Sequence, residues 1–484
     1  MALKHLIALT SIVLTANAQT TASACASSIA PQNAAPSVAP GFRVQVVANG
    51  LTAPRGIAFD SEGGLLVVER QRGIVRLRLT GDGACVRVDG AAERVVENDS
   101  LNHGIAISQD GRTLYGSSHS NVYAWDYDGS QGRTTSDSRD IIEGMGEAQG
   151  HVTRTLLLSQ RTPGLLLVSR GSVGNIDAQT LDVNSGVSTI KAFNVTNITD
   201  SAYDHASSGL LLGWGLRNSV GVAEDPVSGG IWSVENSVDD MPRSGQVINE
   251  GNPGEEMNFH GYLNGTTAGV QGRNYGYPSC FAVWNASLIP DFDGETGTQF
   301  AIGEQNATVN DTFCANDRVG PRLTFAAHSA PLDLKFNTNG TAAWVTMHGS
   351  WNSEDPIGYK LSLVEFDGNG SPRAAANSTT AAIDIVSNQD QSDCPDQCFR
   401  PVGLAWDSQG RLFMSSDSTG EIYVVTKEDG SGVADVSGAS SDGTSTSTTS
   451  SAPSPTGNSG ARKTWNVGSG SYLIAGAAFV GAMV

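Results

Sequence analysis

The chain has 484 residues, of which 39% are hydrophobic, 16% are charged and 57 are glycine. Its formal net charge of −20 argues against nucleic acid or an anionic membrane surface as a partner, because both would repel it. The length accommodates one large all-β domain between two terminal segments of different composition.

The N-terminal segment is predicted to be a secretory signal. Lys4 precedes an apolar run at 6–14 and a small-x-small cleavage pattern at 16–18. The run is too short to span a bilayer, which argues against a membrane anchor. We therefore expect a signal peptide at 1–18, followed by an N-terminal extension at 19–39.

One strand-turn-strand unit recurs along the middle of the chain. The two clearest copies begin at Pro54 and Pro401 and share an apolar strand, an Asp-x-x-Gly turn, a second apolar strand and a Gly turn. The other copies begin at His103, Thr153, Arg217 and Ala330.

The irregular spacing of these units, roughly forty to ninety residues, fits four-stranded blades with loop insertions. A propeller closes radially and so protects its sheet edges. A β-sandwich is the alternative, but a sandwich needs no repeating unit. The predicted fold is therefore an all-β, six-bladed β-propeller spanning 40–429.

Cysteines and glycosylation sequons agree with secretion. A secreted chain favours disulfides over a metal site, and six cysteines allow fifteen pairings. Proximity favours Cys280–Cys314 and Cys394–Cys398, which leaves Cys25 for Cys85. Nine Asn-x-Ser/Thr sequons suggest a glycosylated surface; they lie at Asn98, Asn194, Asn197, Asn264, Asn285, Asn306, Asn310, Asn339 and Asn377.

The C-terminal segment reads as a stalk and a processing signal. Residues 430–458 are rich in Ser, Thr, Gly and Pro and have too few large apolar side chains to fold, so we expect an O-glycosylated stalk. Residues 459–484 follow the order of a GPI-anchor signal: a small-residue site, a polar spacer and an apolar tail. The expected location is extracellular, at the cell surface, with membrane contact only through the GPI lipid.

Polar residues stand immediately before the first strand of several units. They are Asn102 and His103, residues 151–154, Arg217 and Asn218, and Arg400. Any one of them alone would be an ordinary solvated loop residue. Their recurrence at one structural position predicts convergence at the mouth of the central channel, where a small-molecule site would form.

Familiar catalytic motifs are not visible. The sequence has no Gly-x-Ser-x-Gly elbow, no His-Glu-x-x-His and no dinucleotide-binding glycine fingerprint. A serine hydrolase, a zincin and a nicotinamide enzyme therefore lack support.

Seven ordered motifs resemble those of a known family. They lie at 51–56, 151–154, 215–218, 274–278, 328–331, 347–351 and 399–401. Over 41–427 the chain is similar to the soluble glucose and sorbosone dehydrogenases that use pyrroloquinoline quinone (PQQ), and especially to the fungal PQQ-dependent pyranose dehydrogenases. The resemblance implies a six-bladed propeller that oxidises an aldose at its anomeric hydroxyl with PQQ and Ca²⁺. Electrons would pass to an external acceptor such as a haem protein.

The resemblance also implies roles for particular residues. His151 is similar to the base that takes the hydroxyl proton while hydride moves to the quinone. Arg217 looks like the arginine that faces the quinone oxygen where negative charge develops. Asn218 and Asn274 would bind the cofactor. Arg400 best fits its carboxylates, with Lys360 and His348 competing for a second cationic position.

The metal and substrate positions are less determined. The resemblance places Ca²⁺ on the backbone carbonyls of Ser237 and Val238. The acidic side chains that follow are either additional calcium ligands or a solvated loop; they are Asp239, Asp240, Glu255 and Glu256. The tryptophan that glucose dehydrogenases place against the sugar is absent here, and His328 or Trp351 is expected to replace it.

Two other functions remain open at this point. One is a calcium-dependent, lactonase-like hydrolase with ligands such as Glu69, Asn102 and Asn218. The other is a non-catalytic surface propeller that binds a glycan or a protein.

Overall fold

A computed structural model describes residues 25, 28–83, 85–146, 149–196 and 201–438 of the chain. The predicted signal peptide, the predicted GPI signal, most of the predicted stalk and the sequon at Asn197 lie outside the described residues.

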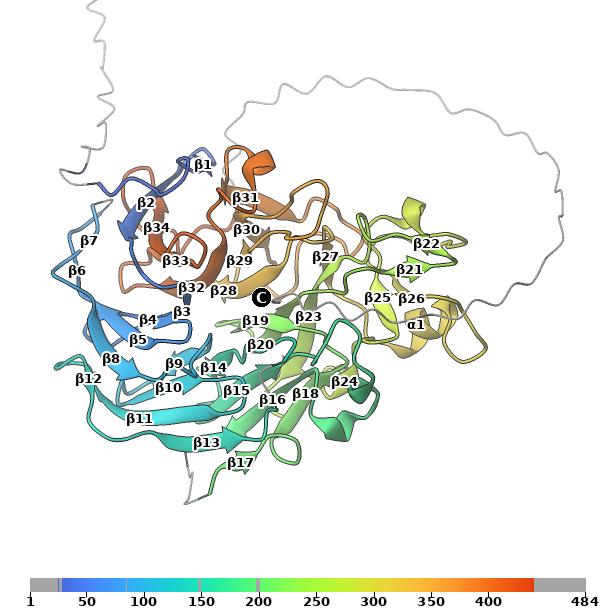
Figure 1. The fold of residues 1–484 in the computed structure, drawn as a ribbon, viewed down its shortest axis with the longest axis horizontal. Coiled ribbons are helices and arrows are strands. Elements are labelled where there is room, and N and C mark those ends of the chain that lie inside the picture. Colours follow the sequence, from blue (N-terminus) through green and yellow to red (C-terminus); the bar gives the residue numbers. More distant parts are fainter. Residues whose placement is uncertain (1–24, 26–27, 84, 147–148, 197–200, 439–484) are drawn as a thin grey trace, which may run out of the picture.

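The strands form six sheets arranged as the blades of a wheel (Figure 1). The first blade contains β3 (Pro54–Phe59), β4 (Leu65–Glu69), β5 (Gly73–Leu77) and β8 (Glu93–Glu97). The second blade contains β9 (Ile105–Ile107), β10 (Thr113–Ser117), β11 (Val122–Asp128) and β13 (Arg139–Glu143), with β12 (Arg133–Thr134) and β17 (Tyr203–Asp204) beside them. The third blade contains β14 (Leu156–Leu158), β15 (Leu165–Arg170), β16 (Thr189–Asn194), β18 (Leu210–Trp214) and β24 (Arg273–Asn274). The fourth blade contains β19 (Ser219–Glu224), β20 (Gly230–Glu235), β23 (Glu255–Tyr262) and β27 (Leu323–Phe325). The fifth blade contains β28 (Pro331–Phe336), β29 (Ala342–Met347), β30 (Lys360–Glu365), β31 (Ala382–Ser387) and β1 (Ser37–Val38). The sixth blade contains β32 (Pro401–Trp406), β33 (Leu412–Ser416), β34 (Glu421–Lys427) and β2 (Phe42–Ala48).

Short elements decorate the blades. The short elements are β6 (Leu79–Thr80), β7 (Arg87–Val88), η1 (Ala178–Leu181), η2 (Val183–Ser185), β21 (Pro242–Arg243), β22 (Gln246–Val247), β25 (Cys280–Ala282), η3 (Ala286–Leu288), β26 (Gln299–Ala301), α1 (Asp311–Asp317) and η4 (Gln391–Asp393). Four of them, β25, η3, β26 and α1, belong to the long insertion between β23 and β27, and β21 and β22 lie between β20 and β23; β21, β22, β25, β26 and α1 extend to the right of the wheel in Figure 1.

The innermost strands of the six blades form a closed ring. Each inner strand contacts the next in the order β3, β9, β14, β19, β28 and β32, and β32 contacts β3. The wheel is closed by β2, which pairs antiparallel with β34, so that blue and red ribbon lie side by side in Figure 1. The prediction of a six-bladed propeller is confirmed, because each predicted unit begins at or just before one of these inner strands.

The Asp-x-x-Gly turns have the geometry that their sequence requires. Asp60 Oδ1 accepts backbone N–H bonds from Glu62 (3.0 Å) and Gly64 (2.7 Å), while the turn glycine at 63 has a φ of 77° that favours glycine. Asp60 Oδ2 also accepts from Arg76 Nε at 2.6 Å. Asp407 repeats this arrangement in the last blade, with Arg411 as its partner at 2.6 Å.

The hydrophobic core lies between blades rather than within one central layer. Six apolar clusters each join two neighbouring blades, and Trp344 and Trp232 are among their fully buried side chains. Because each blade is covered on both faces, its middle strands are apolar at consecutive positions, as in Leu65–Glu69, where every residue is buried and the four before Glu69 are Leu or Val. The strands therefore read as apolar runs rather than as strict alternation.

The three expected disulfides are confirmed. Cys25 pairs with Cys85, Cys280 with Cys314, and Cys394 with Cys398. Within the described ranges, no helix has the length and hydropathy to cross a membrane.

Candidate active site

A cavity opens at the end of the wheel where the inner strands begin, and its empty space, counted together with the open solvent at its mouth, is about 540 Å³. Its walls combine residues that precede β14, β19, β28 and β32 with loops that follow β20 and β29. The structure therefore brings together the polar blade-entry residues of three blades that the sequence had marked, whereas Asn102 and His103, marked in a fourth blade, do not line the cavity. The lining residues are His151, Arg217, Asn218, Asn236, Ser237, Asp239, Glu255, His328, Ala330, Leu332, His348, Gly349, Ser350, Trp351, Asn352 and Arg400.

The His151 imidazole is held in one tautomer. It is 4% exposed, and its Nδ1 lies 3.1 Å from the Ser172 carbonyl oxygen and 2.9 Å from Ser172 Oγ. The hydroxyl of Ser172 donates to the Gly174 carbonyl at 2.7 Å, so both Ser172 atoms accept from Nδ1. The proton therefore lies on Nδ1, and Nε2 keeps a free lone pair that is able to accept a proton.

Burial keeps this imidazole neutral. Desolvation, and then the charge of Arg217, hold the pKa of His151 well below its usual 6.5. A base with this pKa is unprotonated at neutral pH and is ready to accept a proton.

The Arg217 guanidinium is fixed by contacts on every side. Nη2 donates to Asn175 Oδ1 at 2.8 Å and to Asp239 Oδ2 at 3.3 Å, Nε donates to the Asn175 carbonyl, and Nη1 donates to the Asn236 carbonyl. Its backbone N–H donates to the buried carboxylate of Glu235. A cation held this rigidly does not need to reorganise when negative charge develops beside it.

A short backbone chain fixes His151 relative to Arg217. The His151 N–H donates to the Ser172 carbonyl at 3.0 Å, and the Ser172 N–H donates to the Arg217 carbonyl at 2.8 Å. Gly171 allows this approach, because a Cβ there would lie 2.8 Å from His151 Cβ and 2.7 Å from Asn218 Oδ1.

Arg400 and His348 form another part of the cavity wall. Arg400 donates from Nε to the His348 carbonyl at 3.1 Å and from Nη2 to the Gly349 carbonyl at 2.6 Å. Its guanidinium lies 5.5 Å from the centre of the Tyr359 ring, and desolvation lowers its pKa. Among the described residues, no carboxylate lies within ion-pair distance of Arg400. His348 is 3% exposed, and desolvation lowers its pKa to about 4.

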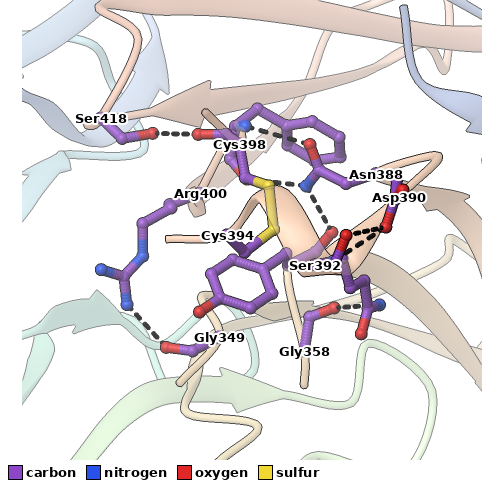
Figure 2. Close-up of a disulfide and its surroundings, with 12 residues drawn as sticks. Gly349, Gly358, Asn388, Asp390, Ser392, Cys394, Cys398, Arg400 and Ser418 are labelled. Atoms are coloured by element: carbon purple, nitrogen blue, oxygen red, sulfur yellow. Dashed lines mark hydrogen bonds between the residues drawn. A yellow bond between two sulfur atoms is a disulfide. The ribbon is translucent and has the colours of Figure 1, made fainter. Parts of the chain in front are cut away.

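The Cys394–Cys398 disulfide supports the segment that carries Arg400 (Figure 2). Both sulfur-bearing residues pack on the buried Tyr359. The amide of Asn388 donates to the carbonyls of Tyr359 and Phe399, each at 3.0 Å, and so clamps the chain immediately before Arg400. Figure 2 shows the arginine reaching from this clamp to the carbonyl of Gly349.

Two carboxylates, those of Glu255 and Asp239, line the cavity. Glu255 accepts backbone N–H bonds from Ser237 at 2.6 Å and Ala330 at 3.2 Å, and desolvation raises its pKa to about 7. Asp239 lies beside it in the cavity wall. The described part of the chain holds no cluster of three or more His, Cys, Asp or Glu side chains spaced for a metal. A calcium ion here would therefore need backbone carbonyls or ligand oxygens to reach its usual six to eight oxygens.

The other two acidic candidates point elsewhere. Asp240 is exposed, and its N–H donates to Asn249 Oδ1 at 2.7 Å. Glu256 is buried and accepts from Asn258 Nδ2 at 3.0 Å. The four acidic side chains are thus divided between the cavity and its surroundings.

His328 and Trp351 lie at the rim. Nε2 of His328 is 2.8 Å from the Asn249 carbonyl, which fixes the ring, and its φ is 65°. Trp351 is 56% exposed although it lines the cavity, so its ring face is available to a ligand.

Three of the expected residues do not line the cavity. Lys360 bonds Asp384 at 2.9 Å and faces a separate depression, because β30 is the third strand of its blade and lies away from the axis. Asn274 belongs to the outer strand β24, where its Oδ1 accepts from the Gly276 N–H at 2.8 Å. The Val238 side chain packs among apolar residues of the insertion. Its assignment as a calcium ligand concerns only its carbonyl oxygen.

The sequence did not single out several polar residues of the site. Asn236 and Asn352 line the cavity, and Asn175 clamps Arg217 from outside it. Asn352 donates from Nδ2 to Asp239 Oδ1 at 3.1 Å. Its position directly after the Trp351 motif was the only sequence signal that could have pointed to it.

The residues suggested for a hydrolase site are not brought together. Glu69 accepts from the Thr52 N–H and from Arg94, and Asn102 donates to the Val152 carbonyl at 2.9 Å. Neither lines the cavity, whereas Asn218 does.

The donor set fits a polyanionic ligand with a hard cation. Arg217 and Arg400 are two strongly held cations, and among the described residues Arg217 has a carboxylate within ion-pair distance whereas Arg400 has none. The Asn352 Oδ1 atom is buried without a hydrogen-bond partner, which leaves an acceptor free for a ligand donor.

Comparisons with known proteins identify the relatives of this chain. A protein-family model described as TrAA12-like matches residues 36–428. A pyrroloquinoline quinone-dependent sugar dehydrogenase from Hypocrea jecorina is 48% identical over 404 residues, which cover 82% of this chain and 91% of that protein.

Solved structures show the same fold. The calcium structure of the Trichoderma reesei carbohydrate-active enzyme of family AA12 has a TM-score of 0.81 at 48% identity, covering 84% of this chain and 100% of that chain. The holo form of the pyranose dehydrogenase PQQ domain from Coprinopsis cinerea has a TM-score of 0.77 at 36% identity, covering 83% of this chain and 99% of that chain.

Proposed function

This chain belongs to the TrAA12-like family, and from that premise we propose that it is a sugar dehydrogenase that uses PQQ and calcium to oxidise an aldose at its anomeric hydroxyl. The observation that carries the proposal is the shared cavity. It holds an unprotonated Nε2 on His151, a rigid Arg217 and an Arg400 that pairs with no carboxylate in the part of the chain that the structure describes.

Each of these groups has a defined task. When bound, PQQ accepts the two electrons and the hydrogen of the anomeric carbon, while calcium acts as a Lewis acid on PQQ. His151 Nε2 accepts the proton of the sugar hydroxyl. Arg217 stabilises the negative charge that develops on the bound PQQ, and Arg400 and His348 bind the carboxylates of PQQ.

Calcium would be held mainly by oxygen atoms around Ser237. The carbonyls of Ser237 and Val238 supply neutral ligands, and Glu255 and Asp239 lie close enough in the wall to supply charge. Asn218 lines the same cavity, and its Oδ1 and His151 Cβ both lie close to Gly171, so Asn218 is proposed to bind the cofactor.

The rim is proposed to bind the sugar. Trp351 offers an exposed aromatic face on which a sugar ring can stack, and His328 offers a fixed imidazole beside it. Electrons leave to an external acceptor such as a haem protein.

Reconstitution tests the proposal directly. The full chain would be loaded with calcium, titrated with PQQ, and assayed for dye reduction with a panel of aldoses. We expect saturable PQQ binding and dye reduction by at least one sugar. A protein that binds PQQ but reduces dye with no sugar would instead be a binding propeller.

The acid limb of the pH profile should depend on Arg217. A base works only when it is unprotonated, so a lowered pKa of His151 extends activity to acid pH, and the limb of kcat/KM should lie well below 6.5. Arg217→Gln removes a charge that lowers this pKa and should move the limb upward by about 0.5–1 pH unit. Arg217→Lys, the matched control, should leave the limb near its wild-type position. A limb in Arg217→Gln that coincides with the wild type would show that the base is another group.

Removing the Cys394–Cys398 disulfide should weaken PQQ binding, whereas removing the Cys25–Cys85 disulfide should not. A double Cys394→Ser/Cys398→Ser variant loosens the chain two residues before Arg400, and ordering one residue costs about 1 kcal/mol. We expect PQQ affinity to fall roughly 5-fold to 10-fold. The double variant Cys25→Ser/Cys85→Ser, far from the cavity lining, should lose thermal stability but keep its PQQ affinity. Equal losses of affinity in both variants would refute this role.

Secretion and GPI anchoring remain proposals for the cellular location. They are supported by three disulfides and by sequon asparagines that are exposed or half-buried wherever the structure describes them. Release of the protein from intact cells by a phosphatidylinositol-specific phospholipase is the expected result.

A further inference from the structure

His348 lines the cavity and also bonds the carboxylate of Asp417, a residue that does not line the cavity. Its Nε2 lies 2.9 Å from Oδ1 of Asp417, and Oδ2 of Asp417 accepts from Arg55 Nη1 at 2.6 Å. Asp417 does not line the cavity, whereas His348 does. Among the described residues, no hydrogen-bond partner is found for the second ring nitrogen, Nδ1.

The charges around this ring come from several elements. Asp417 lies in the turn between β33 and β34, Arg55 is on β3, and Arg400 precedes β32. His103 lies 3.3 Å from Arg55 Nε, and Arg70 is close enough to interact with Asp417. The charged or titratable groups of the cavity are His151, Arg217, Asp239, Glu255 and His328.

Asp417 determines which nitrogen of the His348 ring carries the hydrogen and which keeps a lone pair. Arg55 holds Asp417 as an anion, and His348 and Arg55 together keep its pKa well below the usual range. An ionised carboxylate only accepts, so Nε2 of His348 must carry a hydrogen. In a neutral ring this leaves Nδ1 with a lone pair, which would repel a ligand oxyanion.

If Nδ1 of His348 also takes up a proton, it becomes a hydrogen-bond donor and attracts a ligand oxyanion. Without a ligand, burial and Arg400 keep His348 neutral near pH 7, while Asp417 favours the charged form. A ligand carboxylate against Nδ1 would place the ring between two anions, where the imidazolium forms a charge-assisted bond on each side.

We propose that Asp417 is a positioning residue, which fixes the Nε2 hydrogen of His348 so that the ring takes up one proton from solvent when a PQQ carboxylate binds at Nδ1. The proton adds to Nδ1, no covalent bond breaks and no electrons move. This inference rests on the proposed function, because it requires that PQQ occupies the cavity.

Calorimetry can count the protons. The calcium-loaded full chain would be titrated with PQQ at neutral pH in PIPES and in Tris, whose ionisation enthalpies differ. The change in apparent binding enthalpy between the two buffers gives the number of protons taken up. We expect Asp417→Asn to take up nearly one proton fewer than the wild type and to bind PQQ about tenfold more weakly.

Two further variants make the result decisive. His348→Gln keeps an amide N–H where Nε2–H was and leaves the Arg55–Asp417 pair intact, so it should fold and should show the same loss of proton uptake. Asp407→Asn removes another arginine-paired carboxylate of the same blade and should leave both proton uptake and affinity unchanged.

The outcomes separate this inference from the proposed function. A wild type that does not bind PQQ overturns both. Tight PQQ binding with equal proton uptake in the wild type and His348→Gln overturns this inference alone. Unequal uptake in these two, with Asp417→Asn equal to the wild type, assigns the proton to His348 and removes Asp417 from the role.

Discussion

His151→Asn is expected to lower kcat by about 10³-fold while PQQ affinity stays within a few-fold of the wild type. The asparagine amide can replace Nδ1–H as the donor to Ser172, so the local backbone should keep its shape. The variant has no counterpart of Nε2, which is the atom that accepts the sugar proton. Dye reduction under saturating sugar, alongside PQQ titration, measures both quantities.

The matched control is another buried histidine. His260 lies in the fourth blade, bonds Ser233 Oγ at 2.8 Å and does not line the cavity. His260→Gln retains a donor near Nε2 and should keep kcat close to the wild-type value. If His151→Asn loses PQQ affinity as much as it loses turnover, His151 binds the cofactor rather than acting as a base.

Arg400→Gln is expected to weaken PQQ binding about 100-fold, or about 3 kcal/mol. The guanidinium is held by the carbonyls of His348 and Gly349 and has no carboxylate partner among the described residues, so its charge is available to an anionic ligand. Equilibrium titration of the calcium-loaded variant measures the loss.

The lysine variant separates charge from geometry. Arg400→Lys keeps the charge but loses the planar fork, and we expect about a tenfold loss. Arg411→Gln, which removes an arginine paired with Asp407 in the same blade, should bind PQQ as the wild type does. Binding by Arg400→Gln at wild-type strength would mean that Arg400 is structural and that other groups hold the ligand.

The fold could be predicted from the sequence because its signals are local. Asp60 and Asp407 each close a tight turn through their own side chains, and each turn joins two apolar strands. Six such units cannot bury their faces singly, so they must stack and close. The role of β2 was not predicted, since its partner β34 lies at the other end of the domain sequence.

The site was predicted where its residues precede inner strands. His151, Arg217 and Arg400 occupy that position in three blades, and radial closure brings them to one mouth. Lys360 also begins a strand, but β30 is the third strand of its blade, and sequence periodicity does not show distance from the axis. Asn175 and Asp417 were missed because they lie in loops without a repeating signal.

The amino-acid sequence by itself determined the repeating unit, the number of blades and the identity of the polar residues at blade entries, whereas it only favoured a disulfide pairing through proximity along the chain. Turn chemistry, apolar runs and short separations along the chain are properties of neighbouring residues. Only the tertiary structure decided which of these polar groups meet, which tautomer Ser172 imposes on His151, and which carboxylate lies behind His348. Those features depend on contacts between residues from different blades or loops, and such contacts exist only after the wheel has closed.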